Sequence, residues 1–555
     1  MARNILLILG SGLGSNLGPN FNLTSDAGAV TPSTATRSEL LAGKIVSVND
    51  ATTSVTVTSI GPCANSITQS LPCPPLTTTT TTSTTSTTST TTTTASPTTT
   101  TTSTTTTAPS PFVSTWRTTN TSVGSSSSTQ VKLPLQNGGT YNFTVNWGDG
   151  NTDTITTWNQ AETTHTYASS GDYTITITGT CSGFAFLNTG DRQKLLSITS
   201  FGSVNFGNNL GIFYGCTNLN LSAVTDTPNL SAMNSIQSIF RGCTSLTTIN
   251  NVNSWNTSTI TNMSFAFQLA TNFNQSLNSW NVTNVVNMSN MFQNATSFNG
   301  DISNWNVSSV QNMSAMFNVA SVFNQNIGGW VVSAVTNMQS MFSFATVFNQ
   351  NIGGWNVMNV TDMGGMFAAA EAFNQNINGW DVGNVIGMSS MFNSAYSFNQ
   401  SLNSWDVSNV TNMQSMFNEN GIFNGNITSW DVSSVTNMQS MFRLASAFNQ
   451  NIGNWDVSSV TNMREMFPGA TAFNQNIGNW NISNVGNFTD FMLGKNTSTY
   501  SSTNLDAIYN GWSSRSVQPN LTITFGTAKY TSAGQTGKNI LTGAPNNWTI
   551  TDGGI

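Results

Sequence analysis

The stretch WNVSSVQNMSAMFNVASVFNQNIGGW, residues 305–330, decides how this chain folds, because the chain repeats it. Tryptophan recurs every 25 residues from Trp255 to Trp480. Phenylalanine keeps the same step in nine copies, at positions 273, 298, 323, 348, 373, 398, 423, 448 and 473. A fixed period of this length indicates stacked repeats, since one coil cannot bury its apolar side chains without neighbours. The sequence therefore predicts a stack of coils whose core consists of Trp, Phe and Met columns.

Each coil carries two apolar patterns. The first has the spacing of one helical face and comprises Met313, Met316, Phe317, Ala320 and Phe323. Gln311 and Asn312 precede it and offer side-chain oxygens to cap a helix start. The second has the spacing of the strand in leucine-rich repeats and comprises Ile327, Trp330, Val332 and Val335. We expect one strand and one short helix per coil, stacked into a leucine-rich-repeat-like solenoid.

The array begins before the first of these tryptophans. Phe213 and Phe240 each precede a cysteine by three residues and a leucine by six, where later coils have Phe-x-x-Ala-x-x-Phe. Free cysteine packs as a small hydrophobic residue, so Cys216 and Cys243 are expected to be buried thiols. The pattern assigns about eleven coils to the solenoid. Its boundaries are placed at residues 191–492, followed by a closing module at 493–555.

A threonine-rich tract that begins at Thr77 and ends at Thr107 divides the part before the array. A stretch without apolar side chains to bury cannot offset the entropy of ordering. Residues 77–111 are therefore interpreted as a linker or stalk, and the threonine tract as a possible O-glycosylation substrate. Residues 1–76 form a short N-terminal segment that we assign to anchoring or assembly.

Residues 112–190 alternate apolar and polar side chains in the stretches TYNFTVNWGDG and HTYASSGDYTITITG, with Gly-Asp turns between them. This pattern predicts a small β-sandwich, so the expected fold class is mixed β and α/β. His165 is the one histidine of the chain. We expect it to have a structural role at a strand start, because a lone histidine without Cys or His neighbours lacks a metal shell.

Two parts of the chain resemble known families. The turn WGDG at residues 147–150 and the strand that follows His165 are similar to those of PKD-like domains. The units MFNVASVFNQNIGGWVVSAVTNM, FYGCTNL and FRGCTSL closely resemble BspA-type leucine-rich repeats, the group also called DUF285. The segments LDAIYNGWSS and NNWTITDGG resemble the closing module of that group. The resemblance covers residues 112–555 and implies adhesion to host or neighbouring-cell surfaces.

Composition argues against several classes of function. Asp, Glu, Lys and Arg make up 6% of the chain, and the net charge is −7 without a basic cluster, so nucleic acid is not an expected partner. The apolar run at residues 5–9 is too short to span a membrane. A single histidine and the lack of a phosphate-binding loop argue against an enzyme. Cys63 and Cys73 either close a short loop as a disulfide or are two unrelated thiols.

One exposed position offers a candidate ligand-binding surface. The residue after each tryptophan points away from the core, and we place it on a concave sheet with neighbouring coils about 4.8 Å apart. The members of interest are Asn356, Asp381, Asp406, Asp431, Asp456 and Asn481. The four aspartates either hold a cation such as Ca²⁺ or a cationic or hydroxyl-rich ligand, or form a solvated acidic face. No other cofactor is expected.

A second exposed file is expected to be structural, as a hydrogen-bonded ladder that satisfies backbone groups of the loops. It comprises the asparagines at positions 299, 324, 349, 374, 399, 424, 449 and 474.

Two functions remain open. In the first, the chain is a non-enzymatic extracellular adhesin on a cell or virion surface, such as a phage tail fibre, and its solenoid binds a protein or glycan on another cell. In the second, it is a fibre or coat subunit that assembles into a filament or shell, with self-association through residues 1–76. A virion protein needs neither a signal peptide nor a sorting tail, and this sequence has no clear example of either.

Overall fold

The structure is a computed structural model that describes residues 110–555 and, before them, the backbone of six strands. These are β1 (Ala2–Leu7), β2 (Asn20–Ser25), β3 (Thr34–Thr36), β4 (Lys44–Asn49), β5 (Ser54–Ile60) and β6 (Ser66–Ser70). They form a β1-β4 pair and a four-stranded sheet in the order β3-β2-β5-β6, within a unit of residues 1–104. Cys63, Cys73 and the tract from Thr77 to Thr107 lie outside the described residues, so their disulfide and glycosylation stay predictions.

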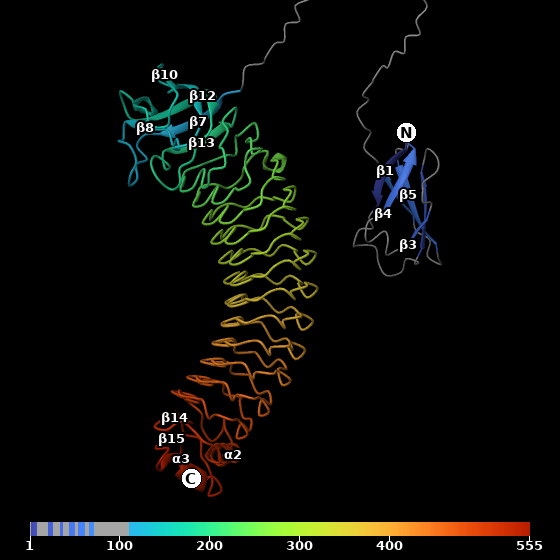
Figure 1. Ribbon diagram of the computed structural model, residues 1–555, viewed down its shortest axis with the longest axis vertical. Coiled ribbons are helices and arrows are strands. Elements are labelled where there is room, and N and C mark those ends of the chain that lie inside the picture. The colour runs from blue at the N-terminus through green and yellow to red at the C-terminus, as the bar shows by residue number, and fades with distance from the viewer. Residues whose placement is uncertain are drawn as a thin grey trace, which may run out of the picture. The chain divides into compact units, whose positions relative to one another are not determined.

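Residues 112–200 fold into two antiparallel sheets (Figure 1). The elements are β7 (Phe112–Arg117), β8 (Gln130–Lys132), β9 (Tyr141–Asn146), β10 (Thr152–Ile155), the 3-10 turn η1 (Ala161–Thr163), β11 (Thr164–Thr166), β12 (Asp172–Cys181) and β13 (Leu195–Ser200). The larger sheet has the order β10-β9-β12-β7-β13, and the smaller one pairs β11 with β8. Alternate residues such as Phe143 and Val145 face a core that includes Trp116 and Trp147, so the expected β-rich fold is confirmed here.

The turn between β9 and β10 depends on glycine. Gly148 has a φ of +83°, and a Cβ atom added there would lie 2.5 Å from the carbonyl oxygen of Thr174. Asp149 accepts a hydrogen bond from the backbone N–H of Asn151 at 3.1 Å and so closes the turn. The short Gly-Asp motif therefore fixes the hairpin in the way that its sequence predicts.

Strand β13 joins the sheets to the coils. It pairs with β7 although it lies beyond residue 190, the predicted end of the sandwich. Its residue Ser197 also forms a parallel bridge with Asn220, and the backbone N–H of Asn220 donates to Leu196 at 2.8 Å. The predicted boundary therefore falls inside one continuous hydrogen-bonded structure.

The coils consist mainly of turns. Apart from the 3-10 turn η2 (Val252–Ser254) they contain no helix, and the segment equivalent to residues 313–323 is not helical in any coil, so the predicted short helix is wrong. Ala315 and Val319 lie in the segment expected to be helical, and both have left-handed φ angles, of 51° and 59°. Ala315 belongs to a turn in which Met316 donates to Met313 at 3.2 Å. Two left-handed residues four positions apart are incompatible with a right-handed helix. The apolar side chains of this segment are nevertheless buried in the core, as their spacing predicts.

The same segment forms the backbone ladder between coils. Backbone N–H groups of one coil donate to carbonyl oxygens of the next at 2.8–3.0 Å, and the pairs are Met313 with Asn337, Ala315 with Gln339, Phe317 with Met341 and Val319 with Ser343. One residue per coil also forms a parallel bridge, in a file from Asn262 to Asn487. Residues 327–335, where we expected the strand, instead form turns, so that prediction is also wrong.

The spacing of the aromatic rings explains where the ladder forms. Equivalent rings in neighbouring coils lie 5.7–5.8 Å apart from Phe292 to Phe467, and 5.9–6.2 Å apart from Phe298 to Phe473. Tryptophan rings lie 6.3–6.5 Å apart from position 305 to position 455. Paired strands need a spacing of about 4.8 Å, so a sheet cannot form beside the tryptophans.

The stack of coils is curved (Figure 1). Because the ring spacing widens from the ladder to the tryptophans, the ladder lies on the inner side of this curve. On the outer side, indole N–H groups take the place of backbone hydrogen bonds. Trp305 donates to the carbonyl of Leu277 at 2.8 Å, and Trp380 donates to that of Ile352 at 3.1 Å. All ten tryptophans from Trp255 to Trp480 are buried, and eight of them tie their coil to the preceding one in this way. The indole N–H groups of Trp255 and Trp455 have no hydrogen-bond partner among the described residues.

The C-terminal segment covers the last coil. It contains α2 (Ser502–Ser513), β14 (Thr522–Thr524), α3 (Gln535–Thr542) and β15 (Thr549–Thr551), and β14 pairs with β15 in parallel. Trp512 of α2 continues the indole series by donating to Ile477 at 3.1 Å, and Ile523 bridges to Phe488 of the last coil. Within the residues that the structure describes, no helix is both long and apolar enough to cross a membrane.

Candidate functional site

The six residues predicted to bind a ligand are exposed and form turns. Each accepts, on its side-chain Oδ1, a hydrogen bond from the backbone N–H two residues later, at 3.0–3.3 Å. The residues are Asn356, Asp381, Asp406, Asp431, Asp456 and Asn481. We call them the Asx column. Amide and carboxylate oxygens accept the same bond, so the turn does not require the negative charge.

The column lies on the outer side of the bend, directly after the tryptophans, so the prediction that it lines a concave sheet is wrong. The wide tryptophan rings keep the coils too far apart for a sheet there. Hydrogen bonds from Ser408, first from its side chain and then from its backbone, lower the pKa of Asp406, and Ser458 does the same for Asp456. Both carboxylates are therefore stably ionised at neutral pH.

In the described residues, no three His, Cys, Asp or Glu side chains gather closely enough to hold a metal ion. Ca²⁺ takes about six to eight oxygen ligands, and each aspartate of the column already uses one oxygen for its turn. The Ca²⁺ hypothesis stays a prediction.

The asparagine ladder is confirmed. Each asparagine accepts, on Oδ1, a hydrogen bond from the backbone N–H of its equivalent in the next coil, as Asn324 does from Asn349 at 3.0 Å. A glutamine adds a second bond, since Gln350 donates to Asn324 at 3.0 Å. The bonds at the other steps are 2.7–3.0 Å long. This file stabilises the loops through its amide oxygens.

A shallow groove of about 540 Å³ crosses three coils on the turn that carries the Asx column. Its lining repeats one asparagine and one Thr or Ile per coil, namely Asn359, Thr361, Asn384, Ile386, Asn409 and Thr411. The asparagine amides donate to the preceding coil, as Asn384 does to Met358 at 2.7 Å. Ile386 is exposed in this groove. The groove therefore combines fixed polar groups with an apolar contact, a composition suited to recognition.

A second surface was not predicted from the sequence. Large apolar side chains are exposed or half-buried at the end of the backbone ladder in five of six successive coils, and the coil with Ala369, Glu371 and Ala372 has none. We call them the apolar strip, and they are Val319, Val322, Phe344, Val347, Tyr396, Ile422 and Leu444. An alignment of the coils could have found it. The outermost coils have glycine at one position, at residues 215, 242, 469 and 494, and central coils have a large apolar residue such as Val319 there.

The coils match one protein family in three overlapping places. A family described as "Mycoplasma protein of unknown function, DUF285" matches residues 208–330, 321–424 and 398–508. Together these matches run from residue 208 to residue 508, more than half of the chain. The chain belongs to the DUF285 family. Comparison with curated proteins and comparison with solved structures give no match.

The predictions for His165, Cys216 and Cys243 can be checked against side-chain positions. His165 stacks on Trp147 with ring centroids 4.9 Å apart, and its Nε2 lies 2.8 Å from Asp149. Partial burial alone would raise the pKa of Asp149, but hydrogen bonds from His165 and Asn151 lower it. His165 thus packs and fixes the glycine turn. Cys216 and Cys243 are buried free thiols as predicted, and burial raises the pKa of both.

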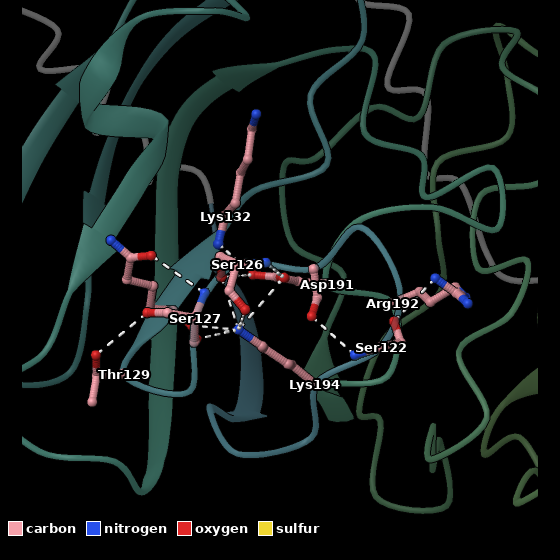
Figure 2. Close-up of polar contacts among 10 residues, drawn as sticks. Ser122, Ser126, Ser127, Thr129, Lys132, Asp191, Arg192 and Lys194 are labelled. Atoms are coloured by element: carbon pink, nitrogen blue, oxygen red, sulfur yellow. Dashed lines mark hydrogen bonds and ion pairs between the residues drawn. The ribbon is translucent and has the colours of Figure 1, made fainter.

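A buried ion pair fastens the segment before β13 to β8 and to the loop that precedes β8 (Figure 2). Lys194 and Asp191 have fully buried side chains, with Nζ and Oδ1 3.5 Å apart. Lys194 donates to the carbonyls of Ser127 and Gln130 at 2.8 Å, and Asp191 accepts from the backbone of Lys132 at 2.7 Å. Burial lowers the pKa of Lys194, and Asp191 opposes that effect. The bonds of this pair hold strand β8 and the loop before it in place, so its role is structural.

Lys495 closes the other end of the DUF285 coils. It occupies the position of Ala470 in the preceding coil, and its ammonium donates to the carbonyls of Ala470 and, at 2.6 Å, of Phe473. Burial lowers its pKa to about 7. A cavity of about 50 Å³ adjoins it. The lysine thus satisfies carbonyl groups where the repeat pattern ends.

Proposed function

We propose that this DUF285 protein is a non-enzymatic recognition protein, displayed outside the cell or on a virion surface. In this proposal the coils form a leucine-rich-repeat-like solenoid that binds a protein or glycan on another cell. The sheets at residues 112–190 serve as a PKD-like spacer, residues 77–111 as a stalk and residues 1–76 as an anchor.

The observation that carries the proposal is the contrast between buried and exposed positions of the coils. Buried positions hold the same residue in successive coils, as the Trp, Phe and Met columns do. Several exposed positions differ from coil to coil, although the asparagine ladder and the Asx turns recur. One of them reads Ser321, Thr346, Glu371, Tyr396 and Gly421 in five successive coils. A subunit that supplied only length would gain nothing from such variation, whereas a binding surface needs different side chains at different places.

The alternative is a fibre or coat subunit, and the continuous backbone ladder is the observation that favours it. Between the coils of Met313 and Met338, for example, four backbone N–H groups donate to the later coil at 2.8–3.0 Å, and Thr336 donates back to Gln311 at 2.9 Å. Such a stack resists bending and stretching, as a filament component must. The two functions differ in what the outer surface contacts.

Binding of the labelled full chain to intact cells tests the proposal. A recognition protein should bind cells of its host or neighbours saturably, and unlabelled chain should compete. Treating the cells with protease or with glycosidases would then show whether the ligand is a protein or a glycan. Binding that neither saturates nor is competed by unlabelled chain on any such cell would contradict the proposal.

A further inference from the structure

Arg241 is a cation that the coils leave without a carboxylate partner. In the part of the chain that the structure describes, it forms no ion pair, and its buried Nε has no hydrogen-bond partner. Arg443 occupies the same coil position, one residue after a Phe of the stacked column, and it pairs with Glu419 at 3.1 Å. Between residues 195 and 300 the sequence has one other charged residue, Asp226, whose carboxylate accepts from the backbone of Phe201 at 2.7 Å. The charge of Arg241 is therefore available to a partner.

Two aromatic rings hold the guanidinium of Arg241 in place. Its Cζ lies 4.7 Å from the ring centroid of Tyr214 in the preceding coil and 5.1 Å from that of Phe265 in the following coil. Ring faces attract a guanidinium but do not neutralise it, and they leave its edge nitrogens able to donate. A planar fork held in this way suits a carboxylate, which accepts two parallel hydrogen bonds.

Phe265 is placed beside Arg241 at a cost in backbone conformation. Phe265 and Leu269 both have left-handed φ angles of 60°. The same two positions of the next coil hold Asn290 and Asn294, a residue type that tolerates this conformation. Bulky residues in a strained conformation are typical of contact sites.

A second arginine adjoins the same part of the stack. Gly215 follows Tyr214 and has a φ of +82°, and a Cβ atom added there would lie 2.6 Å from Cδ of Arg192. The absence of that atom gives Arg192 room to lie against this coil. Arg192 donates to Oγ of Ser122 at 3.1 Å, and among the described residues it forms no ion pair. Two guanidinium groups thus approach the segment of Tyr214 and Gly215 in a chain whose net charge is −7.

We propose that Arg241, held between Tyr214 and Phe265, binds a side-chain carboxylate of a partner protein, in an acidic segment that also presents apolar side chains. This inference rests on the proposed function and deepens it, because it assigns the partner to proteins and gives the place of contact. Complementary charge selects the acidic group, and Tyr and Arg are the residue types that contribute most to protein interfaces.

The surroundings of Arg241 favour a protein over a glycan. Leu187 is 43% exposed and Leu269 is 41% exposed. A Cβ atom added at Gly211 would lie 3.4 Å from Cδ2 of Leu187 and 3.3 Å from Cβ of Tyr214, so Leu187 lies on the same side of the coil as the aromatic ring. Leu269 follows in the coil of Phe265. Apolar side chains of a peptide can pack on these leucines, whereas the hydroxyl groups of a sugar find no hydrogen-bond partner on them.

Binding of the full chain to an immobilised random copolymer of glutamate and tyrosine tests the proposal by surface plasmon resonance. The net charge of −7 gives the chain no general attraction to a polyacid, so binding reports a local site. Wild type should bind saturably, and Arg241→Met should bind at least about tenfold more weakly. Phe265→Asn should also bind more weakly, while its thermal midpoint stays equal or rises, because asparagine tolerates the left-handed conformation.

The matched control is Arg443→Met, which removes an arginine from the same coil position where Glu419 already balances its charge. It should bind the copolymer as wild type does. A wild-type chain that does not bind the copolymer would overturn the proposal, and so would equal binding by wild type and Arg241→Met. Tighter binding to heparin than to the copolymer would overturn it as well, and would assign the arginine to a sulfated glycan.

The same variants in the assay with intact cells separate this inference from the proposed function. If wild type and Arg241→Met bind cells equally, recognition uses another surface, and this inference fails while the proposed function stands. If wild type binds the copolymer through Arg241 but binds no cell, the proposed function fails while the carboxylate site stands.

Discussion

Lys495 shows how a single residue at the end of a repeat changes the pH response of the fold. Burial lowers its pKa from 10.5 to about 7. Between these values the unfolded chain binds more protons than the folded chain, so stability rises with pH in that range. We predict that the free energy of unfolding increases by on the order of 1–2 kcal/mol between about pH 7 and pH 9. Denaturant titrations of wild type and Lys495→Met measure it.

The Met variant should lose this pH dependence, because it removes the titrating group. The exposed Lys529, changed to Met, serves as control and should keep the wild-type slope. An equal slope in wild type and in the Lys495 variant would show that the buried ammonium is not the source.

Asp431 separates the two interpretations of the Asx column at the residue scale. If the column forms turns, Asp431→Asn should leave stability nearly unchanged, since Asn356 accepts the same bond in its own coil. Asp431→Ala should cost about 1 kcal/mol through loss of that hydrogen bond. If the column binds Ca²⁺, wild type should melt higher with Ca²⁺ than with a chelator, and Asp431→Asn should reduce the difference. Thermal melts in both conditions decide between them.

At the scale of elements, the asparagine ladder is the part that the sequence predicted best. Polar residues that recur at one exposed position must bond to their neighbours or to backbone, and Asn374 does so by accepting from Asn399 at 3.0 Å. We predict that Asn374→Ala costs about 1–3 kcal/mol, because a loop N–H loses its partner. Asn374→Asp should cost less, since both carboxylate oxygens still accept. Urea denaturation of the two variants compares them, and equal losses would contradict this role.

The helix and strand predictions failed for one shared reason. Apolar side chains at i, i+3, i+4 and i+7 face one side of a helix. They also face one side of a run of turns that has two left-handed residues four positions apart. Ser340 and Ala369 have that conformation without glycine to mark it. The strand could not form where it was expected, because the width of the tryptophans sets the coil spacing there. Periodicity therefore predicted burial correctly and backbone conformation incorrectly.

At the scale of the whole molecule, the stack should tolerate the loss of a complete coil. Deleting residues 356–380 joins Trp355 to Asp381 and keeps every column, the backbone ladder and the asparagine ladder in register. We predict a folded protein with a single cooperative thermal transition and a small change in midpoint. Deleting only residues 356–367 shifts the ladder against the columns and should prevent cooperative folding. Circular dichroism melts compare the two, and equal damage would contradict a modular stack.

The two ends of the stack could not be predicted from the repeat periodicity, because each of their features occurs once. Nothing in the periodicity indicates that Lys194 and Asp191 are buried together, or that Trp512 on a helix continues the indole series. The Asx column was found as a file but placed on the wrong side, since the bend depends on ring spacing that the sequence does not state.

The central claim is that the variable outer surface of the DUF285 coils meets a partner outside the cell or particle that carries it. Immunogold electron microscopy of the native source, with an antibody against the coils, tests this most directly. We predict label at the exposed ends of surface projections, away from the body that carries them. Uniform label along a regular filament, or within a closed coat, would contradict the claim. It would show that the coils are a structural component of that filament or coat.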